Sequence, residues 1–324
     1  MGTLHIFPQL ITFFVISVLI FQNHPSNAFF FHCNPHLPVL GRPIHPTDVE
    51  LLQFALNLEY LETEWFLNGA LGYGLDTVEP RLAGGGPVPL GARAARLDNV
   101  TREIIAEFGY QEVGHLRAIK STVGGFPRPL IDLRAHVFAK IMDSAFGYNL
   151  DPPFNPYHST INYLIASYLI PYVGLVGYVG ASPNINGYVS KGLLAGLLAV
   201  ESGQDAVIRT FLYQRANEIV LPYKNLTVAD FTTHISRLRN QLGSCGNKDE
   251  GILVDRSSGA ERRTSSNVLS ADGNSVAYRR TPAEILRIVY GTGDESRPGG
   301  FLPRGGGGTI ATDMVRFRLK FHLN

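Results

Sequence analysis

This sequence of 324 residues has almost no excess charge of either sign, because 28 lysines and arginines nearly balance 27 aspartates and glutamates. The formal charge of +1 removes the basic surface that a nucleic-acid-binding protein needs. The glycine- and proline-rich stretch 81–90 has too few charges for a phosphate-binding loop, and no Lys-Ser/Thr pair follows it. A nucleophile elbow is also missing, since Gly-Ala-Ser-Pro at 180–183 lacks the second glycine. What remains is a chain with 45% hydrophobic residues, enough for a sizeable core.

A long apolar run at the amino terminus is also missing. The apolar stretch 10–21 is shorter than the roughly 20 residues that span a bilayer. It is followed by a polar stretch and by small residues ending at Ala28, the pattern of a signal peptide. We therefore predict a signal peptide over residues 1–28 and secretion, with membrane contact only through this segment. An uncleaved anchor is the alternative.

Only two cysteines occur, Cys33 and Cys245. An oxidising destination would allow them to form a disulfide, and free thiols are the alternative. The histidines around Cys33 fit no zinc-ligand spacing. Asn99 and Asn225 begin N-x-Thr sequons, which a secreted chain could use for glycosylation, and Asn225 is the better acceptor because it falls in a predicted loop.

Apolar residues at helical spacing predict four long helices. The predicted ranges are about 47–68, 94–121, 159–180 and 186–218. A cap at Thr47–Asp48 starts the first, and a shorter helix capped by Asp132 is expected up to residue 146. The third long helix is apolar nearly all round, which indicates a central buried element, and Pro171 within it predicts a kink.

After Pro222, residues 223–310 are expected to form accessory helices and loops. Residues 227–230 open a short amphipathic helix to about residue 242, with Asp230 near its positive end. A capping box with proline at the first helical position begins another short helix at Thr281, and the polar stretch 257–277 is expected to be mobile. Residues 299–308 read as a glycine-rich loop or linker. In the tail, 311–324, the last ten residues alternate apolar and polar, which predicts a strand. An edge strand, a frayed tail and a basic attachment to an anionic surface all remain open.

Two pairs of polar residues at a spacing of three stand on the apolar stripes of two predicted helices. Glu112 and His115 form the first pair, and Glu201 and Gln204 form the second. This spacing puts each pair on one helix face, directed inward. Burying a carboxylate without compensation is costly, so a cation is the simplest explanation. Carboxylates together with imidazole favour iron or manganese over calcium.

Metal-bearing bundles add single glutamates from other helices, and Glu59 is the candidate on the first helix, with Glu62 in reserve. The segment Leu56–Trp65, the Glu112/His115 helix, Pro-Phe-Asn-Pro-Tyr at 153–157 and Gly-Gly-Phe-Leu-Pro at 299–303 together resemble the plant desiccation-related proteins of the ferritin-like superfamily. The resemblance extends over about residues 40–308. It implies an all-α ferritin-like four-helix bundle over 40–222 with accessory short helices and an irregular C-terminal region. It also implies secretion to the apoplast or cell wall and a link to water deficit.

The resemblance carries metal-ligand positions onto Glu59, Glu112, His115 and Glu201. Two further positions depart from the superfamily pattern: Pro171 stands where bacterial relatives have a third-helix glutamate, and Gln204 stands at the position of the last histidine. One metal position is then complete and the other is depleted, which predicts at most one iron or manganese ion. Glu62 and Gln204 are expected just behind the ligands, with Gln204 orienting Glu201.

Three functions stay open at this stage, with no protein partner indicated. The chain is expected to be a stress-protective protein holding at most one metal ion, without catalysis. The first alternative is a metal-dependent oxidase or peroxide scavenger, and the second is a metal-free structural shield or storage protein. In the metal-free case His115 would be protonated between Glu59 and Glu112. Tyrosines 60, 168 and 172 could neighbour the site, but core positions are expected for them.

Overall fold

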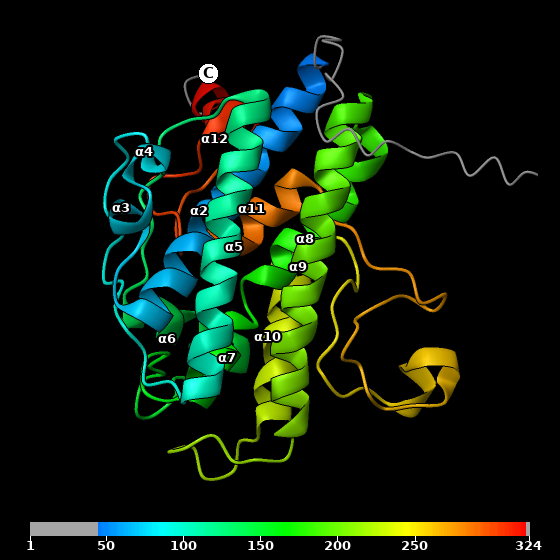
Figure 1. Ribbon diagram of the computed structural model, residues 1–324. Coiled ribbons are helices and arrows are strands. Elements are labelled where there is room, and N and C mark those ends of the chain that lie inside the picture. The colour runs from blue at the N-terminus through cyan, green and yellow to red at the C-terminus, as the bar shows by residue number, and fades with distance from the viewer. Residues whose placement is uncertain (1–44, 322–324) are drawn as a thin grey trace, which may run out of the picture. The chain divides into compact units, whose positions relative to one another are not determined.

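The computed structural model describes residues 45–321, so the predicted signal peptide and Cys33 lie outside the described part. Long helices dominate this part, and over residues 45–321 the extended pairings are isolated bridges rather than strands. The prediction of an all-α bundle is confirmed. Its elements are α2 (Pro46–Leu71), α5 (Asn99–Val123), α7 (Thr160–Ser167), α8 (Pro171–Ala181) and α9 (Tyr188–Gln214), shown in Figure 1.

Helix α2 begins at Pro46, which suits the first helical turn because its missing N–H would have no partner there. The predicted cap at Thr47–Asp48 is wrong. The carboxylate of Asp48 instead accepts hydrogen bonds from the backbone N–H groups of Asn186 at 2.9 Å and Gly187 at 2.7 Å. It therefore ties the start of α2 to the start of α9.

Helix α5 begins at Asn99, five residues later than predicted. Asp98 has extended backbone, and its side chain accepts a hydrogen bond from the backbone N–H of Thr101 at 2.9 Å, which is N-cap geometry. The helix ends where Gly124 adopts a φ of +68°, a conformation that favours glycine.

The predicted third helix is two helices, α7 and α8. Residues 168–170 between them form turns in place of a regular α-helix, and Pro171 becomes the first residue of α8 rather than a kink inside one helix. By length and hydropathy the stretch 160–184 could cross a membrane, yet 78% of its apolar window is buried inside the protein. This is the pattern of a core element, as its all-round apolar character predicted.

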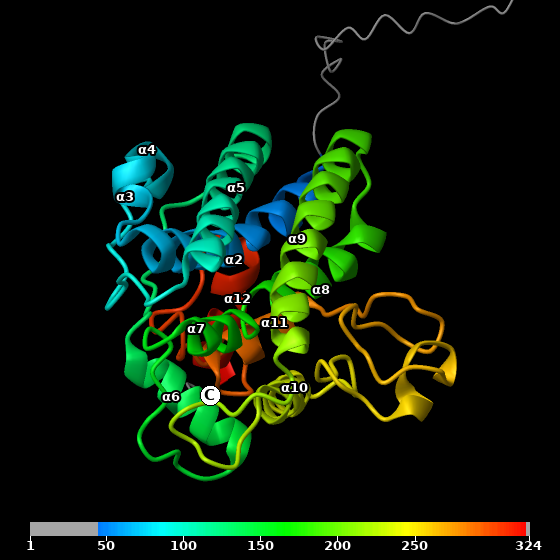
Figure 2. The same ribbon diagram turned by 60° about the horizontal axis from the view of Figure 1, so that its bottom comes forward.

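Helix α2 packs along α5, and α8 packs along α9, while α2 also contacts α8 (Figures 1 and 2). Fully buried aromatic side chains fill the space between them. The Trp65 ring stacks on Tyr163 with centroids 4.4 Å apart, and its indole N–H donates to the Ser167 hydroxyl at 2.9 Å. This packing holds α7 against α2.

Shorter elements surround the bundle. The predicted capping box of Thr281 with Glu284 is confirmed, and the helix predicted to open at Thr227 also begins with a capping box, formed with Asp230. Asp132 does not cap the next helix directly: Arg134 is the N-cap, and Asp132 accepts its backbone N–H and its guanidinium. The remaining elements are α3 (Leu75–Val78), α4 (Pro80–Ala83), α6 (Ala135–Phe146), η1 (Ser182–Asn184), α10 (Val228–Gly243), η2 (Arg256–Ser258), η3 (Ala260–Arg262), α11 (Pro282–Tyr290) and α12 (Gly308–Phe321).

The predicted C-terminal strand is wrong, because residues 308–321 form helix α12. Ile310, Ala311 and Met314 pack against the core at helical spacing, a stripe that precedes the alternating residues. The side chain of Asn57 accepts the N–H of Gly307 at 2.7 Å and donates to its carbonyl at 3.0 Å, which holds the start of α12 on α2. Without a neighbouring strand, a helix satisfies the backbone groups internally.

Candidate metal centre

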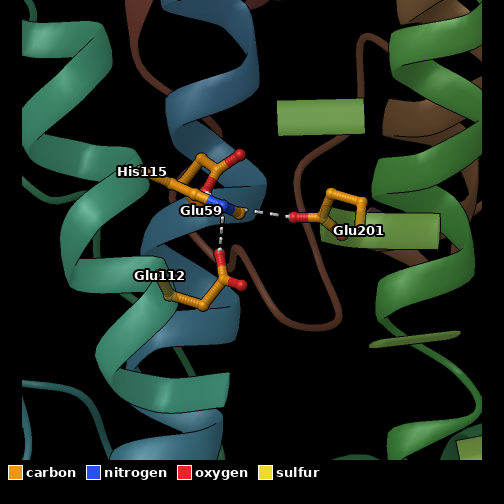
Figure 3. Close-up of side chains that lie close together, drawn as sticks. All are labelled: Glu59, Glu112, His115 and Glu201. Atoms are coloured by element: carbon orange, nitrogen blue, oxygen red, sulfur yellow. Dashed lines mark hydrogen bonds and ion pairs between the residues drawn. The ribbon is translucent and has the colours of Figure 1, made fainter. Parts of the chain in front are cut away.

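All four predicted ligand residues converge inside the bundle. Helix α2 supplies Glu59, α5 supplies Glu112 and His115, and α9 supplies Glu201 (Figure 3). One ligand atom from each residue lies within 4.8 Å of the others. The spacing of three on α5 puts Glu112 and His115 on one face, and the packing of α2 and α9 brings the other two carboxylates to it.

Three carboxylates surround one nitrogen of His115. Its Nδ1 atom lies 3.1 Å from Glu59, 3.2 Å from Glu112 and 3.6 Å from Glu201. The three glutamates are at most 1% exposed, whereas His115 is 8% exposed. Solvent therefore reaches the cluster only at the edge of the imidazole.

Burial and mutual repulsion control the protonation of the cluster. Burial would lower the pKa of His115, but Glu59 and the other two carboxylates raise it well above its ordinary value. Burial would raise the pKa of Glu59, yet His115 lowers it overall. Burial and the neighbouring Glu201 and Glu59 raise the pKa of Glu112 well above its ordinary value. Burial raises the pKa of Glu201 to about 7, although His115 opposes the rise.

Glu62 is a fifth ionisable member of the cluster. It lies one turn from Glu59 on α2 and is fully buried, and burial together with Glu201 raises its pKa well above the ordinary value. Neither of its carboxylate oxygens has a hydrogen-bond partner within residues 45–321, and Oε2 of Glu201 has none there either. Unpaired buried carboxylate oxygens are costly, which indicates that a cation belongs between them.

Helix α8 leaves space beside these oxygens. A Cβ atom on Gly174 would lie 3.0 Å from Oε1 of Glu62 and 3.4 Å from Oε2 of Glu201. Pro171, which we predicted to occupy the position of a third-helix glutamate in bacterial relatives, begins α8 and brings no carboxylate. Glu62 supplies a carboxylate from α2 instead.

Two neutral side chains position the carboxylates. Gln204 donates to Glu112 at 2.6 Å and to Gln111 at 3.2 Å, rather than contacting Glu201 as predicted, because α9 faces α5 here. The hydroxyl of Tyr178 on α8 donates to Glu59 in a very short hydrogen bond. Sequence reasoning missed Tyr178, although its spacing of four from Gly174 puts both on the face of α8 that meets the cluster.

The tyrosines named from the sequence lie elsewhere in the core, as expected. The hydroxyl of Tyr60 donates to the carbonyls of Leu82 and Phe126. Tyr168 and Tyr172 bind backbone carbonyls of residues 248–250. Glu64 forms a buried ion pair with Arg128, pointing away from the cluster.

The remaining predicted residues lie at the surface. Asn99 is exposed at the first position of α5, and Asn225 is exposed in the loop between α9 and α10. Both positions are open to modification. Cys245 is an exposed free thiol within the described residues.

The ferritin-like domain family matches residues 47–214, which span the four long helical segments of the bundle. The chain belongs to the ferritin-like family. It is 61% identical over 279 residues to the ferritin-like catalase Nec2 of Nesocodon mauritianus, covering 86% of this chain and 89% of that protein. It is 53% identical over 275 residues to the desiccation-related protein PCC13-62 of Craterostigma plantagineum, covering 85% of this chain and 88% of that protein. No solved structure matches the chain.

Membership of the ferritin-like family agrees with the donor set of the cluster. Glutamates and a Glu-x-x-His pair projecting inward from separate helices are the ligands that metal-bearing bundles of this architecture use. Carboxylate oxygens and one imidazole suit iron or manganese. The residues present therefore fit a metal centre.

Proposed function

We propose that this chain is a secreted metalloprotein that decomposes hydrogen peroxide and thereby protects the extracellular space during water deficit. Its similarity to a protein named a ferritin-like catalase supports the reaction, and its similarity to a desiccation-related protein supports the physiological setting. Secretion rests on the signal-peptide pattern of residues 1–28. Sequencing the amino terminus of the secreted protein, expected to begin near residue 29, tests that part.

The observation that carries the proposal is the number of buried carboxyl groups gathered in one place. Four of them, those of Glu59, Glu62, Glu112 and Glu201, share the buried cluster with one imidazole. Two divalent cations would balance four ionised carboxylates with His115 neutral, whereas with a single divalent cation two of the carboxyl groups would have to stay protonated, as the raised pKa values of Glu62 and Glu112 describe for the metal-free cluster. The presence of Glu62 therefore replaces the expectation of at most one ion with the proposal of two.

Peroxide decomposition matches a centre of this kind. One hydrogen peroxide is oxidised to dioxygen, releasing two electrons and two protons, and a second takes these up and is reduced to two waters. Bound iron or manganese would supply the redox chemistry that stores the two electrons between these halves. The five ionisable residues would hold the metal, while Gln204 and Tyr178 orient Glu112 and Glu59.

Metal content and oxygen release test the proposal together. The full mature chain, produced with iron and manganese available, should contain two ions per chain by elemental analysis and release dioxygen from hydrogen peroxide at an oxygen electrode. One bound ion without oxygen release would support the metal-binding protective protein. A metal-free protein without oxygen release would support the hydrogen-bonded network and the structural shield.

The Glu112→Gln variant sharpens this test because it removes a carboxylate at the centre of the cluster. We expect at least a tenfold loss of metal affinity and of oxygen release. Glu103→Gln is the matched control, since Glu103 is exposed on the same helix. In metal-free protein the Glu112 change should not lower the melting temperature, because the raised pKa of Glu112 already keeps that carboxyl protonated and an amide has nearly the same shape and the same charge. Equal metal content in both variants would contradict a ligand role for Glu112.

A further inference from the structure

A cavity separate from the carboxylate cluster lies on the other side of α2. Its volume is about 580 Å³, within the range of roughly 300–1,000 Å³ typical of small-molecule sites. It is bounded by α6, α10, α11 and the loop 297–303, and it opens to solvent. None of the five ionisable residues of the cluster lines it.

The floor of the cavity is apolar. Leu58 and Leu61 of α2 contribute to it, as do Leu169, Ile170 and Val173 around the start of α8. Leu58 and Leu169 are each 6% exposed although they belong to the core, which is consistent with their facing this space. An apolar group placed here would be removed from water at a gain of about 25 cal/mol per Å².

The mouth of the cavity is cationic. Lys140 and His136 are exposed on α6, and Arg297 is exposed on the opposite loop. Among the described residues that line the cavity, the one carboxylate is Asp132, which is bound by the guanidinium of Arg134 at 2.5 and 2.9 Å. An anionic group at the mouth would therefore meet positive charge with little opposing negative charge.

We propose that this cavity binds a small amphipathic organic anion, with its apolar body against the leucines of α2 and its acidic group at the mouth beside Lys140 and Arg297. Charge complementarity selects an acid over an amine, and the depth of the apolar floor selects a body such as an aromatic ring or a short alkyl chain. This inference is independent of the proposed peroxide chemistry.

A molecule bound in the cavity would contact a helix that also carries residues of the carboxylate cluster. Leu58 and Leu61 neighbour Glu59 and Glu62 on α2, so one turn of that helix presents leucines to the cavity and glutamates to the cluster. On α8, Val173 lines the cavity and its neighbour Gly174 faces the cluster. A bound anion would thus contact α2, which carries Glu59 and Glu62, and α8, whose Gly174 lies beside Glu62.

Binding can be measured with 8-anilinonaphthalene-1-sulfonate, an amphipathic aromatic anion whose fluorescence rises in apolar surroundings. The folded full chain should bind the probe at one site, and dodecanoate should displace it. Dodecyltrimethylammonium, which has the same tail and the opposite charge, should displace it at least tenfold less well. Equal displacement by the two amphiphiles would overturn the proposal, because the mouth would then not select charge.

Two variants locate the site. Ile141→Trp fills the cavity from α6 and should weaken probe binding at least tenfold, whereas Val100→Trp adds the same ring at an exposed position on α5 and should leave it unchanged. The double variant Lys140→Glu with Arg297→Glu reverses the charge at the mouth and should also weaken probe binding at least tenfold. Lys191→Glu, which reverses an exposed charge on α9, is the control and should leave probe binding unchanged.

Melting temperature and near-ultraviolet circular dichroism establish that each variant is folded, since loosely packed states also bind this probe. Metal content, measured in parallel, separates this proposal from the metal centre: loss of probe binding with unchanged metal is the expected result. Unchanged probe binding in a folded Ile141→Trp protein would place the probe elsewhere and overturn the proposal.

Discussion

At the scale of single residues, the buried glutamates of the cluster differ in what neutralises them. Glu59 has His115 and the hydroxyl of Tyr178, and Glu112 has the amide of Gln204, whereas the oxygens of Glu62 have no hydrogen bond within the described chain. A hydrogen bond to a carboxylate is worth about 1.5–3 kcal/mol, so these contacts set which glutamate stays ionised without metal.

The Tyr178→Phe variant should lower the unfolding free energy of the metal-free protein by about 1–3 kcal/mol. The lost hydroxyl leaves Glu59 ionised with one donor fewer. Urea denaturation of metal-free protein measures the change. Tyr110→Phe on α5, where the ring is 50% exposed, is the control and should have almost no effect. Equal effects of the two changes would refute the contact.

Asp205 on α9 is not part of the metal cluster, and it makes the free energy of unfolding depend on pH. Burial raises its pKa from 3.8 to about 6, although Arg209, 3.9 Å away, opposes the rise. The native state therefore holds a proton between these pH values that the unfolded state releases. The stabilisation is full below pH 3.8 and is lost as the pH rises through 6.

The Asp205→Asn variant, which cannot ionise, should gain stability relative to the unmodified chain by on the order of 2–3 kcal/mol between pH 3.5 and pH 7. Denaturation curves of both proteins at the two pH values give this difference. A difference that does not change with pH would mean that Asp205 is ionised throughout.

At the scale of elements, the break between α7 and α8 is stabilised by a helix from the C-terminal part. Arg239 on α10 donates from Nη1 to the carbonyl of Tyr168 at 2.5 Å and forms a buried ion pair with Asp249. The same guanidinium lies 4.6 Å from the centre of the Tyr168 ring. Arg209 binds the carbonyls of Asn267 and Val268, so residues 249–268 are attached to the bundle by buried cations.

The Arg239→Met variant should therefore lower the unfolding free energy by about 3–5 kcal/mol, because it leaves Asp249 buried without its partner. Guanidinium denaturation measures the loss. Arg237→Met, exposed on the same helix, should cost less than about 0.5 kcal/mol. Similar losses in both variants would show that the break does not depend on this ion pair.

At the scale of the whole molecule, metal binding should add to the stability of the described bundle, since α2, α5 and α9 each carry residues of the cluster and the ion would hold these helices together. An ion that binds only the native state stabilises it by mass action, by about 2.7 kcal/mol at a hundredfold excess over the dissociation constant. Without metal, burial and repulsion keep Glu62 and Glu112 protonated, as their raised pKa values indicate, so the metal-free bundle should be the less stable form.

Removal of metal by a chelator should consequently lower the melting temperature by several degrees, and added manganese or iron should restore it. Differential scanning fluorimetry of the full chain follows both steps. The Glu112→Gln protein should show no chelator effect, which excludes a direct action of the chelator on the fold. A melting temperature that stays constant while elemental analysis shows metal loss would contradict a bundle held by its ions.

Local sequence determined the helices and the first ligands. The helix starts at Thr227 and Thr281 were predicted because the signals that begin a helix lie within four residues of one another, and Glu112 and His115 because a spacing of three puts them on one helix face whatever surrounds it. Only the tertiary structure decided which partners these faces meet. Glu62, Tyr178, the contact of Gln204 with Glu112, and α12 in place of a strand all depend on packing between segments far apart in the chain. Burial and contacts of that kind set the charge of a carboxylate and the conformation of a tail, and no local pattern contains them.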